Sequence, residues 1–181
     1  MRIEKLKTEH GVRVEWRAFP LHPETPSEGR ALADLFARRS PEERAAMHAQ
    51  MKARMTAEGL PYGDRTMTYN SRLAQELGKW ADTQTAGEAL HDALFRAYFV
   101  EARDISQPGV LLDVVERAGL SREQAREVLE QRTFKAAVDA DWDLARQYGI
   151  TAVPTFVAGR HGVVGAQPYE ALEDLVRRAA R

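Results

Sequence analysis

The chain has 181 residues, of which 44% are hydrophobic, and its formal net charge is −1. This length fits one domain, or one domain that carries a large insertion, and the balanced charge offers no basic field for nucleic acid or an anionic membrane. Because the sequence contains no cysteine, disulfides, thiolate metal ligands and a thiol nucleophile are excluded within these residues.

The first residues predict the end of a helix. Ile3 and Leu6 are apolar among charged neighbours, and Gly11 suits a left-handed helix cap. The same stretch lacks the apolar core of a signal peptide, and no segment approaches the roughly 20 apolar residues of a membrane span. We therefore expect a cytoplasmic protein without a membrane partner.

Residues 12–19 then alternate between the two faces of an extended chain. Val12, Val14, Trp16 and Ala18 share one face, and charged residues occupy most of the other. This period of two predicts a half-buried strand.

The middle of the chain reads as helical. Helix starts are predicted at Thr25–Pro26, Ser40–Pro41, Asn70–Ser71, Thr85 with Glu88, Ser106 to Pro108, Ser121 with Gln124, and Thr133. In the helix after Ser40, we expect Ala46, Met47, Met51 and Met55 to face the core, and a methionine-lined binding groove is the alternative. Trp80 is expected in the core, with a place beside Asn70 in a cleft between insertion and sheet as the alternative.

The end of the chain predicts strand, hairpin, strand and helix. Gly149 stops a helix, and Pro154 stands at the entrance of the apolar run Thr155–Ala158, where proline is tolerated as a first strand residue. A turn near Gly159 leads to a second strand around residues 163–164, and Pro168 suits the start of a last helix.

We therefore predict an α/β fold in which the early strand pairs with the late ones. Residues 1–24 and 132–181 would form this α/β domain, and residues 25–131 a large, all-helical insertion. The last helix should pack back on the sheet. The five scattered histidines show no metal-ligand spacing, so we expect no metal site, and we assign no catalytic residue within this chain.

Several stretches, in this order along the chain, carry a resemblance to a known family. They are residues 14–23, 70–74, 94–99, 103–105, 149–156 and 164–169. Together they resemble the DsbA-like thioredoxin family, and more specifically its FrnE-type branch of dithiol–disulfide oxidoreductases and isomerases. Relatives of this branch include 2-hydroxychromene-2-carboxylate isomerases and kappa-class glutathione transferases.

The resemblance implies a thioredoxin-like fold with a helical insertion and a cis peptide bond between Val153 and Pro154. Family members begin with a strand and a Cys-x-x-Cys motif, whereas Met1 aligns after that motif, so the first strand is expected to be missing. Gln75 also stands where relatives often carry histidine. We expect either a fragment or late start of such a protein, or a member that has lost redox chemistry.

The resemblance also implies a binding site. The backbone of Val153, with Pro154 and Thr155, would pair with a disulfide-containing peptide or protein. If the chain resembles its glutathione-using relatives, the loop before the last helix, which is Gly165, Ala166 and Gln167 in this sequence, would contact a carboxylate of the tripeptide. No cofactor is expected in the first case, and glutathione is possible in the second.

Three functions stay open on this basis. They are a disulfide oxidoreductase or isomerase without its redox cysteines, a glutathione-dependent isomerase or transferase, and a non-catalytic peptide-binding module. Asn70 is a further candidate substrate-binding residue. A homodimer is also expected if the exposed sheet edge pairs with a second copy.

Overall fold

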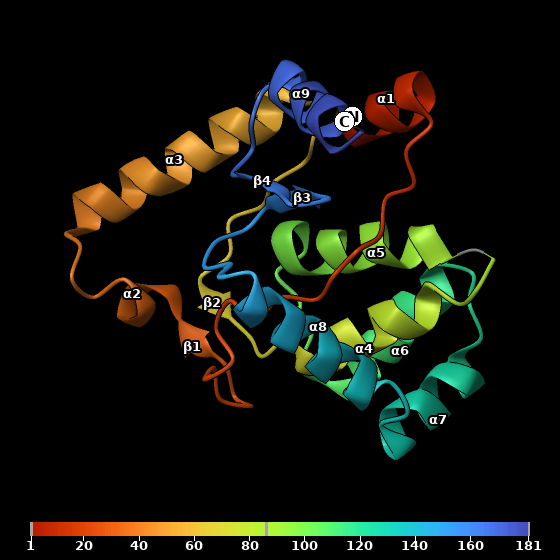
Figure 1. Ribbon diagram of the computed structural model, residues 1–181. Helices are drawn as coiled ribbons and strands as arrows, with labels where there is room; N and C mark the ends of the chain where they lie inside the picture. Colours follow the sequence, from red (N-terminus) through yellow and green to blue (C-terminus); the bar gives the residue numbers. More distant parts are fainter. Residues whose placement is uncertain (1, 86, 181) are drawn as a thin grey trace. The chain divides into compact units, whose positions relative to one another are not determined.

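The computed structural model describes residues 2–85 and 87–180, and it is mainly helical with two small sheets (Figure 1). The elements in chain order are α1 (Arg2–His10), β1 (Arg30–Ala31), α2 (Leu32–Leu35), α3 (Pro41–Ala57), β2 (Met67–Thr68), α4 (Arg72–Ala81), α5 (Gly87–Phe95), the π-helix η1 (Arg96–Val100), α6 (Pro108–Arg117), α7 (Arg122–Gln131), α8 (Lys135–Gln147), β3 (Thr155–Ala158), β4 (His161–Val164) and α9 (Tyr169–Ala179).

The chain divides into two compact units. One contains residues 1–21 and 139–181, and the other contains residues 22–138. The sequence placed its domain limits after residues 24 and 131, and as domain limits these stay a prediction.

The first unit is built around the antiparallel hairpin β3–β4. Its strands pair from Thr155 opposite Val164 to Ala158 opposite His161, joined by a two-residue turn. Helix α9 packs against both strands, as predicted, and buries Leu172 and Leu175. Helix α1 lies beside α9 (Figure 1).

The strand predicted at residues 12–19 is wrong. Residues 11–20, all within the described range, form no strand, and β3 pairs with β4 rather than with this segment. Side-chain hydrogen bonds, and not strand pairing, fix the position of this segment. Asp141 of α8 is nearly fully buried and accepts hydrogen bonds from Arg17 Nη1 and from the Ala18 amide, each at 2.9 Å. Trp16, expected to face inward, is half exposed.

The second unit has a core made by α4, α5, η1, α6 and α7. Leu77, Leu90, Leu111 and Val115 are fully buried in it, and Trp80 is 5% exposed, in agreement with its predicted core position. The helix starts predicted at Ser40, Ser106 and Ser121 agree with the structure to within two residues. Ser40 forms the predicted capping box with Glu43.

Two other predictions in this unit are wrong. No helix starts at Thr25–Pro26: a turn closes from the Gly29 amide to the Pro26 carbonyl, and the chain pairs as β1 with β2 before α2 begins. The region is therefore not helical throughout. Helix α3 does not bury its methionines either, because none of its seventeen residues, all of them described, is buried.

Candidate functional site

The residues predicted around the proline come together at the open end of the β3–β4 hairpin. The peptide bond between Val153 and Pro154 is cis, the isomer that the resemblance to the DsbA-like family implies. The Gly165 amide donates to the Pro154 carbonyl at 2.7 Å, which extends the hairpin ladder by one pair. Gly165 has φ +89°, a left-handed conformation that favours glycine at this position.

The register decides which backbone groups face outward. Hydrogen-bonded pairs alternate with non-bonded pairs in an antiparallel ladder, and Pro154 opposite Gly165 is a bonded pair. Thr155 and Val157 therefore direct their N–H and C=O groups away from β4, to the outer edge of β3. Within residues 2–85 and 87–180, no strand other than β4 pairs with β3.

The side chains next to this edge are apolar and exposed. Val153 is 46% exposed and Val157 44% exposed, and Val164 is exposed on the paired strand. Phe156 and Val163, on the alternate face, are partly buried where α9 packs. The hairpin thus has one covered face and one open apolar face, next to unpaired backbone groups.

The loop before α9 completes the predicted cluster. Ala166 and Gln167 are exposed, and the Gln167 side-chain amide donates to the Val164 carbonyl at 2.9 Å. Arg2 Nη1 lies 3.2 Å from the Gln167 carbonyl oxygen, so a cation stands beside the N-terminal end of α9. Thr155 Oγ1 donates to the Ala152 carbonyl at 2.6 Å.

Tyr169, in the first turn of α9, has a perturbed hydroxyl. Its Oη donates to Glu9 Oε2 at 2.6 Å, and Lys5 Nζ lies 4.1 Å from the ring centroid. The hydrogen bond to the Glu9 carboxylate, together with burial, raises the pKa of Tyr169 to about 12. The phenol therefore stays protonated at neutral pH and ties α9 to α1.

Asn70 belongs to the second unit, and both polar atoms of its side chain form hydrogen bonds within that unit. Its Nδ2 donates to the Thr25 carbonyl at 2.8 Å, and its Oδ1 accepts from the Arg72 amide at 2.9 Å, at the start of α4. This arrangement fixes the helix start. Its predicted role in substrate binding stays a prediction.

The second unit contains a buried ion cluster that was not predicted from the sequence. Glu76, 0% exposed, accepts hydrogen bonds from Arg132 at 2.6 and 2.7 Å and from Arg72 Nε at 2.8 Å. Burial alone would raise the pKa of Glu76, but the two guanidinium groups outweigh it and hold the pKa below its ordinary value. The only sequence signal was a glutamate inside the apolar stripe of α4.

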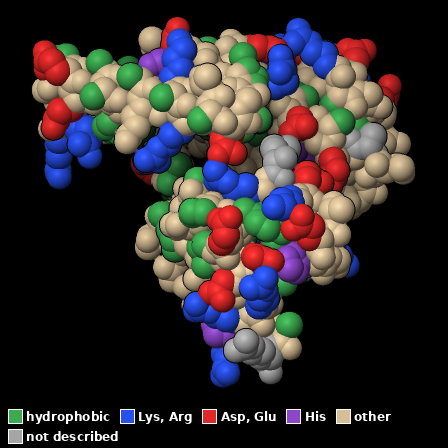
Figure 2. All heavy atoms as spheres, turned by 90° about the horizontal axis from the view of Figure 1, so that it is seen from above, with side chains coloured by type: hydrophobic (Ala, Val, Ile, Leu, Met, Phe, Trp, Pro, Cys, Tyr) green, Lys and Arg blue, Asp and Glu red, His purple; other side chains and the backbone are tan. Residues whose placement is uncertain are grey.

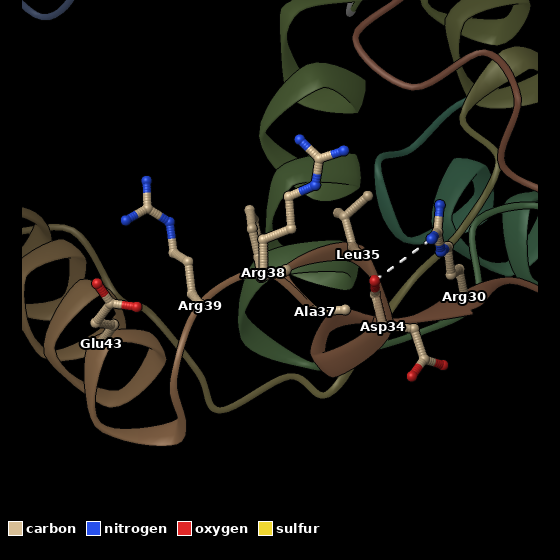
Figure 3. A pocket seen from close by; sticks show the side chains of 8 residues that line it. Arg30, Asp34, Leu35, Ala37, Arg38, Arg39 and Glu43 are labelled. Atoms are coloured by element: carbon tan, nitrogen blue, oxygen red, sulfur yellow. Dashed lines mark hydrogen bonds between the residues drawn. The ribbon is translucent and has the colours of Figure 1, made fainter.

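A pocket of about 520 Å³ lies between α2 and the start of α3 (Figure 3). Arg30, Arg38 and Arg39 line it together with Asp34 and Glu43. The three guanidinium groups stand apart rather than meeting at one point, and Arg30 Nη2 is directed at the Asp34 carbonyl oxygen, 3.4 Å away. With charges of both signs and exposed side chains, the pocket shows no arrangement for a particular ligand.

Among the described residues, no group of three or more histidine, aspartate or glutamate side chains is placed to hold a metal ion. None of the described helices has both the length and the hydropathy to cross a membrane.

Comparisons with known proteins agree with the fold. The family model of the DSBA-like thioredoxin domain matches residues 1–177. The chain is similar to a probable DsbA oxidoreductase from Streptomyces coelicolor, with 30% sequence identity and a TM-score of 0.89, over 99% of this chain and 82% of the other.

A second solved structure, a 2-hydroxychromene-2-carboxylate isomerase, has 18% identity and a TM-score of 0.73 over 99% of this chain and 87% of the other. That identity supports likeness of fold alone. No curated protein matches the chain. The family match over nearly the whole length, together with the proline-led hairpin and the helical region before it, shows that the chain belongs to the DsbA-like thioredoxin domain family.

Proposed function

We propose that this chain binds an extended main-chain segment of a disulfide-containing peptide or protein along the outer edge of β3. The observation that carries the proposal is the register of the hairpin, which leaves the N–H and C=O groups of Thr155 and Val157 unpaired at that edge. A peptide that adds as a strand satisfies such groups by main-chain hydrogen bonds. The exposed side chains of Val153 and Val157 would contact the alternate side chains of the peptide.

The proposal assigns binding, and not thiol exchange, to these residues. The exchange carried out by FrnE-type relatives requires a thiolate that attacks the substrate disulfide. None of the 181 residues is a cysteine. We therefore expect this polypeptide to reduce no insulin and to isomerise no disulfides, and turnover by a cysteine-free preparation would contradict this.

Glutathione is the second candidate ligand. Ala166 and Gln167 are exposed just before the N-terminal end of α9, and Arg2 lies beside them. A helix N-terminus favours a carboxylate, so the tripeptide would lie with its main chain on β3 and one carboxylate near Gln167.

The test is a titration followed by the amide resonances of the protein. One arm uses a short peptide of alternating valine and threonine with one internal cystine, and a second arm uses oxidised glutathione. We expect the Thr155 and Val157 amides to shift most in the first arm. Shifts centred on Gln167 in the second arm alone would favour glutathione.

Two matched proline variants make the test specific for one edge. Val157→Pro removes one of the two outward donors of β3, and Val164→Pro removes one of the two outward donors of β4. Proline is tolerated on such edge positions. We expect Val157→Pro to weaken peptide binding at least tenfold, and Val164→Pro to leave it within twofold. Equal effects, or no binding to wild-type protein at millimolar peptide, would contradict the proposal.

A further inference from the structure

Helix α3 contacts the rest of its unit through one narrow face. Arg44, His48 and Met55 are its half-buried residues, and they share one side of the helix. The His48 ring lies 5.7 Å from the Tyr62 ring, and the side chain of Asp64 lies within 3.4 Å of both His48 and Lys52. The remaining faces of this 17-residue helix are open.

Apolar side chains occupy an open face of α3. Met47 is 38% exposed and Met51 is 44% exposed, and as i, i+4 neighbours they form one patch, flanked by Ala46. Figure 2 shows hydrophobic side chains at the surface along the stretch on the left that α3 occupies in Figure 1. Burial of this patch against a partner would remove apolar surface from water.

The distribution of charge along α3 favours an antiparallel arrangement with a second copy of the same helix. Glu42 and Glu43 stand in the first turn, and Lys52 and Arg54 stand near the other end. A parallel copy would place like charges together, whereas an antiparallel copy places acid opposite base and also opposes the helix dipoles. Within residues 2–85 and 87–180, no salt bridge engages Arg54, so its guanidinium is available.

We propose that α3 pairs antiparallel with α3 of a second copy of this chain, about a twofold axis between residues 48 and 49. Glu43 then faces the partner's Arg54, and Met47 faces the partner's Gln50. Each contact occurs twice because the interface is isologous. The face that carries Glu43, Met47, Gln50 and Arg54 lies about 100° around the helix from the face that contacts the unit.

The contact spans one helix of about 25 Å, so it belongs with small, weak interfaces. We expect a dimer at about 100 µM and a monomer below about 1 µM. Sedimentation or light scattering across this range measures the mass, which should rise from 20.4 kDa toward twice that value. A constant monomer mass up to about 200 µM would overturn the proposal.

Two lysine variants separate this interface from pairing through the sheet edge. Met51→Lys places a charge in the α3 patch, and Val157→Lys places one on β3 at a side chain of equal exposure, 44%. We expect Met51→Lys to weaken the dimer at least tenfold and Val157→Lys to leave it unchanged. The opposite pattern would assign the dimer to the hairpin and overturn the proposal.

A charge exchange tests direction and register. Glu43→Arg and Arg54→Glu should each weaken the dimer about tenfold, because each turns two attractive contacts into repulsive ones. The double variant restores the attraction and should return to within about threefold of wild type. Glu43→Arg also breaks the capping box in both the single and the double variant, so recovery cannot come from the cap. A double variant as weak as the single ones would overturn the antiparallel register.

Discussion

Helices α3 and α4 have similar sequence patterns, but α4 is buried in the core of its unit and α3 lies at the surface. Each follows a serine and carries apolar residues at helical spacing. In α4, six of ten residues are buried, including Glu76 and Leu77, because α5 and α7 pack against it. In α3, none of the seventeen described residues is buried. Helical spacing therefore predicts that a stripe exists, but not that a partner within the chain covers it.

Truncation of one side chain in each helix should give the largest contrast. Leu77 is 0% exposed, so Leu77→Ala loses burial and leaves a cavity, at a cost of about 4 kcal/mol in the free energy of unfolding. Met51→Ala should change it by less than about 0.5 kcal/mol. Urea unfolding at micromolar concentration measures both values, and comparable losses would show that α3 has a covered face.

The buried carboxylate of α4 gives the next largest effect. Glu76→Gln removes the charge that Arg72 and Arg132 share, and we expect a loss of about 2 to 3 kcal/mol. The value is at the low end for a buried pair because the Arg132 side chain is 40% exposed and can be hydrated. The control is Glu42→Gln on α3, an exposed carboxylate that should cost less than about 0.5 kcal/mol.

The stability loss caused by Glu76→Gln should depend on pH. The pKa of Glu76 is lower in the folded state than the value of about 4.3 expected when unfolded. Its contribution is therefore fully present above about pH 5 and is lost as pH falls through the folded pKa. The stability gap between wild type and Glu76→Gln should narrow in acid, and a gap that widens there would contradict this assignment.

The sequence predicted most accurately the features that are determined by residues close together in the chain. The hairpin from Thr155 to Val164 follows from a proline, a turn and two short apolar runs. The cap at Ser40 follows from a serine, a proline and a glutamate in fixed order. Such signals are local, whereas the binding role of Val153 and Gly165 was implied by the family resemblance and stays a prediction.

The predictions that proved wrong are those that contacts between distant residues overrode. The alternation of residues 12–19 is typical of a strand, but a strand needs a neighbour, and Asp141 holds this segment by single hydrogen bonds. The Thr25–Pro26 helix start was overridden by pairing of residues 30–31 with 67–68. The cluster around Glu76 joins positions 56 residues apart, and no spacing in the sequence reveals it.

The smallest predicted effect concerns the start of α3. Ser40 Oγ accepts the Glu43 amide at 3.2 Å, and the Glu43 carboxylate accepts the Ser40 amide at 2.8 Å. Ser40→Ala removes one of these bonds, at a cost of about 1 kcal/mol to the helix. Because α3 buries none of its described residues, we expect this cost to lower the free energy of local opening of the helix. The free energy of global unfolding should stay within about 0.3 kcal/mol of the wild-type value.

Amide hydrogen exchange at micromolar concentration measures this effect residue by residue. Amides of α3 should exchange about fivefold faster in Ser40→Ala, which is the rate equivalent of about 1 kcal/mol, whereas α4 amides should be unchanged. Ser121→Ala is the matched control, because Ser121 Oγ caps α7, in which Ala125, Val128 and Leu129 are buried. In Ser121→Ala we expect the loss of the cap to lower the free energy of global unfolding. If both variants slowed or sped exchange in the same way, α3 would open together with the core, and the contrast between the exposed and the buried helix would not hold.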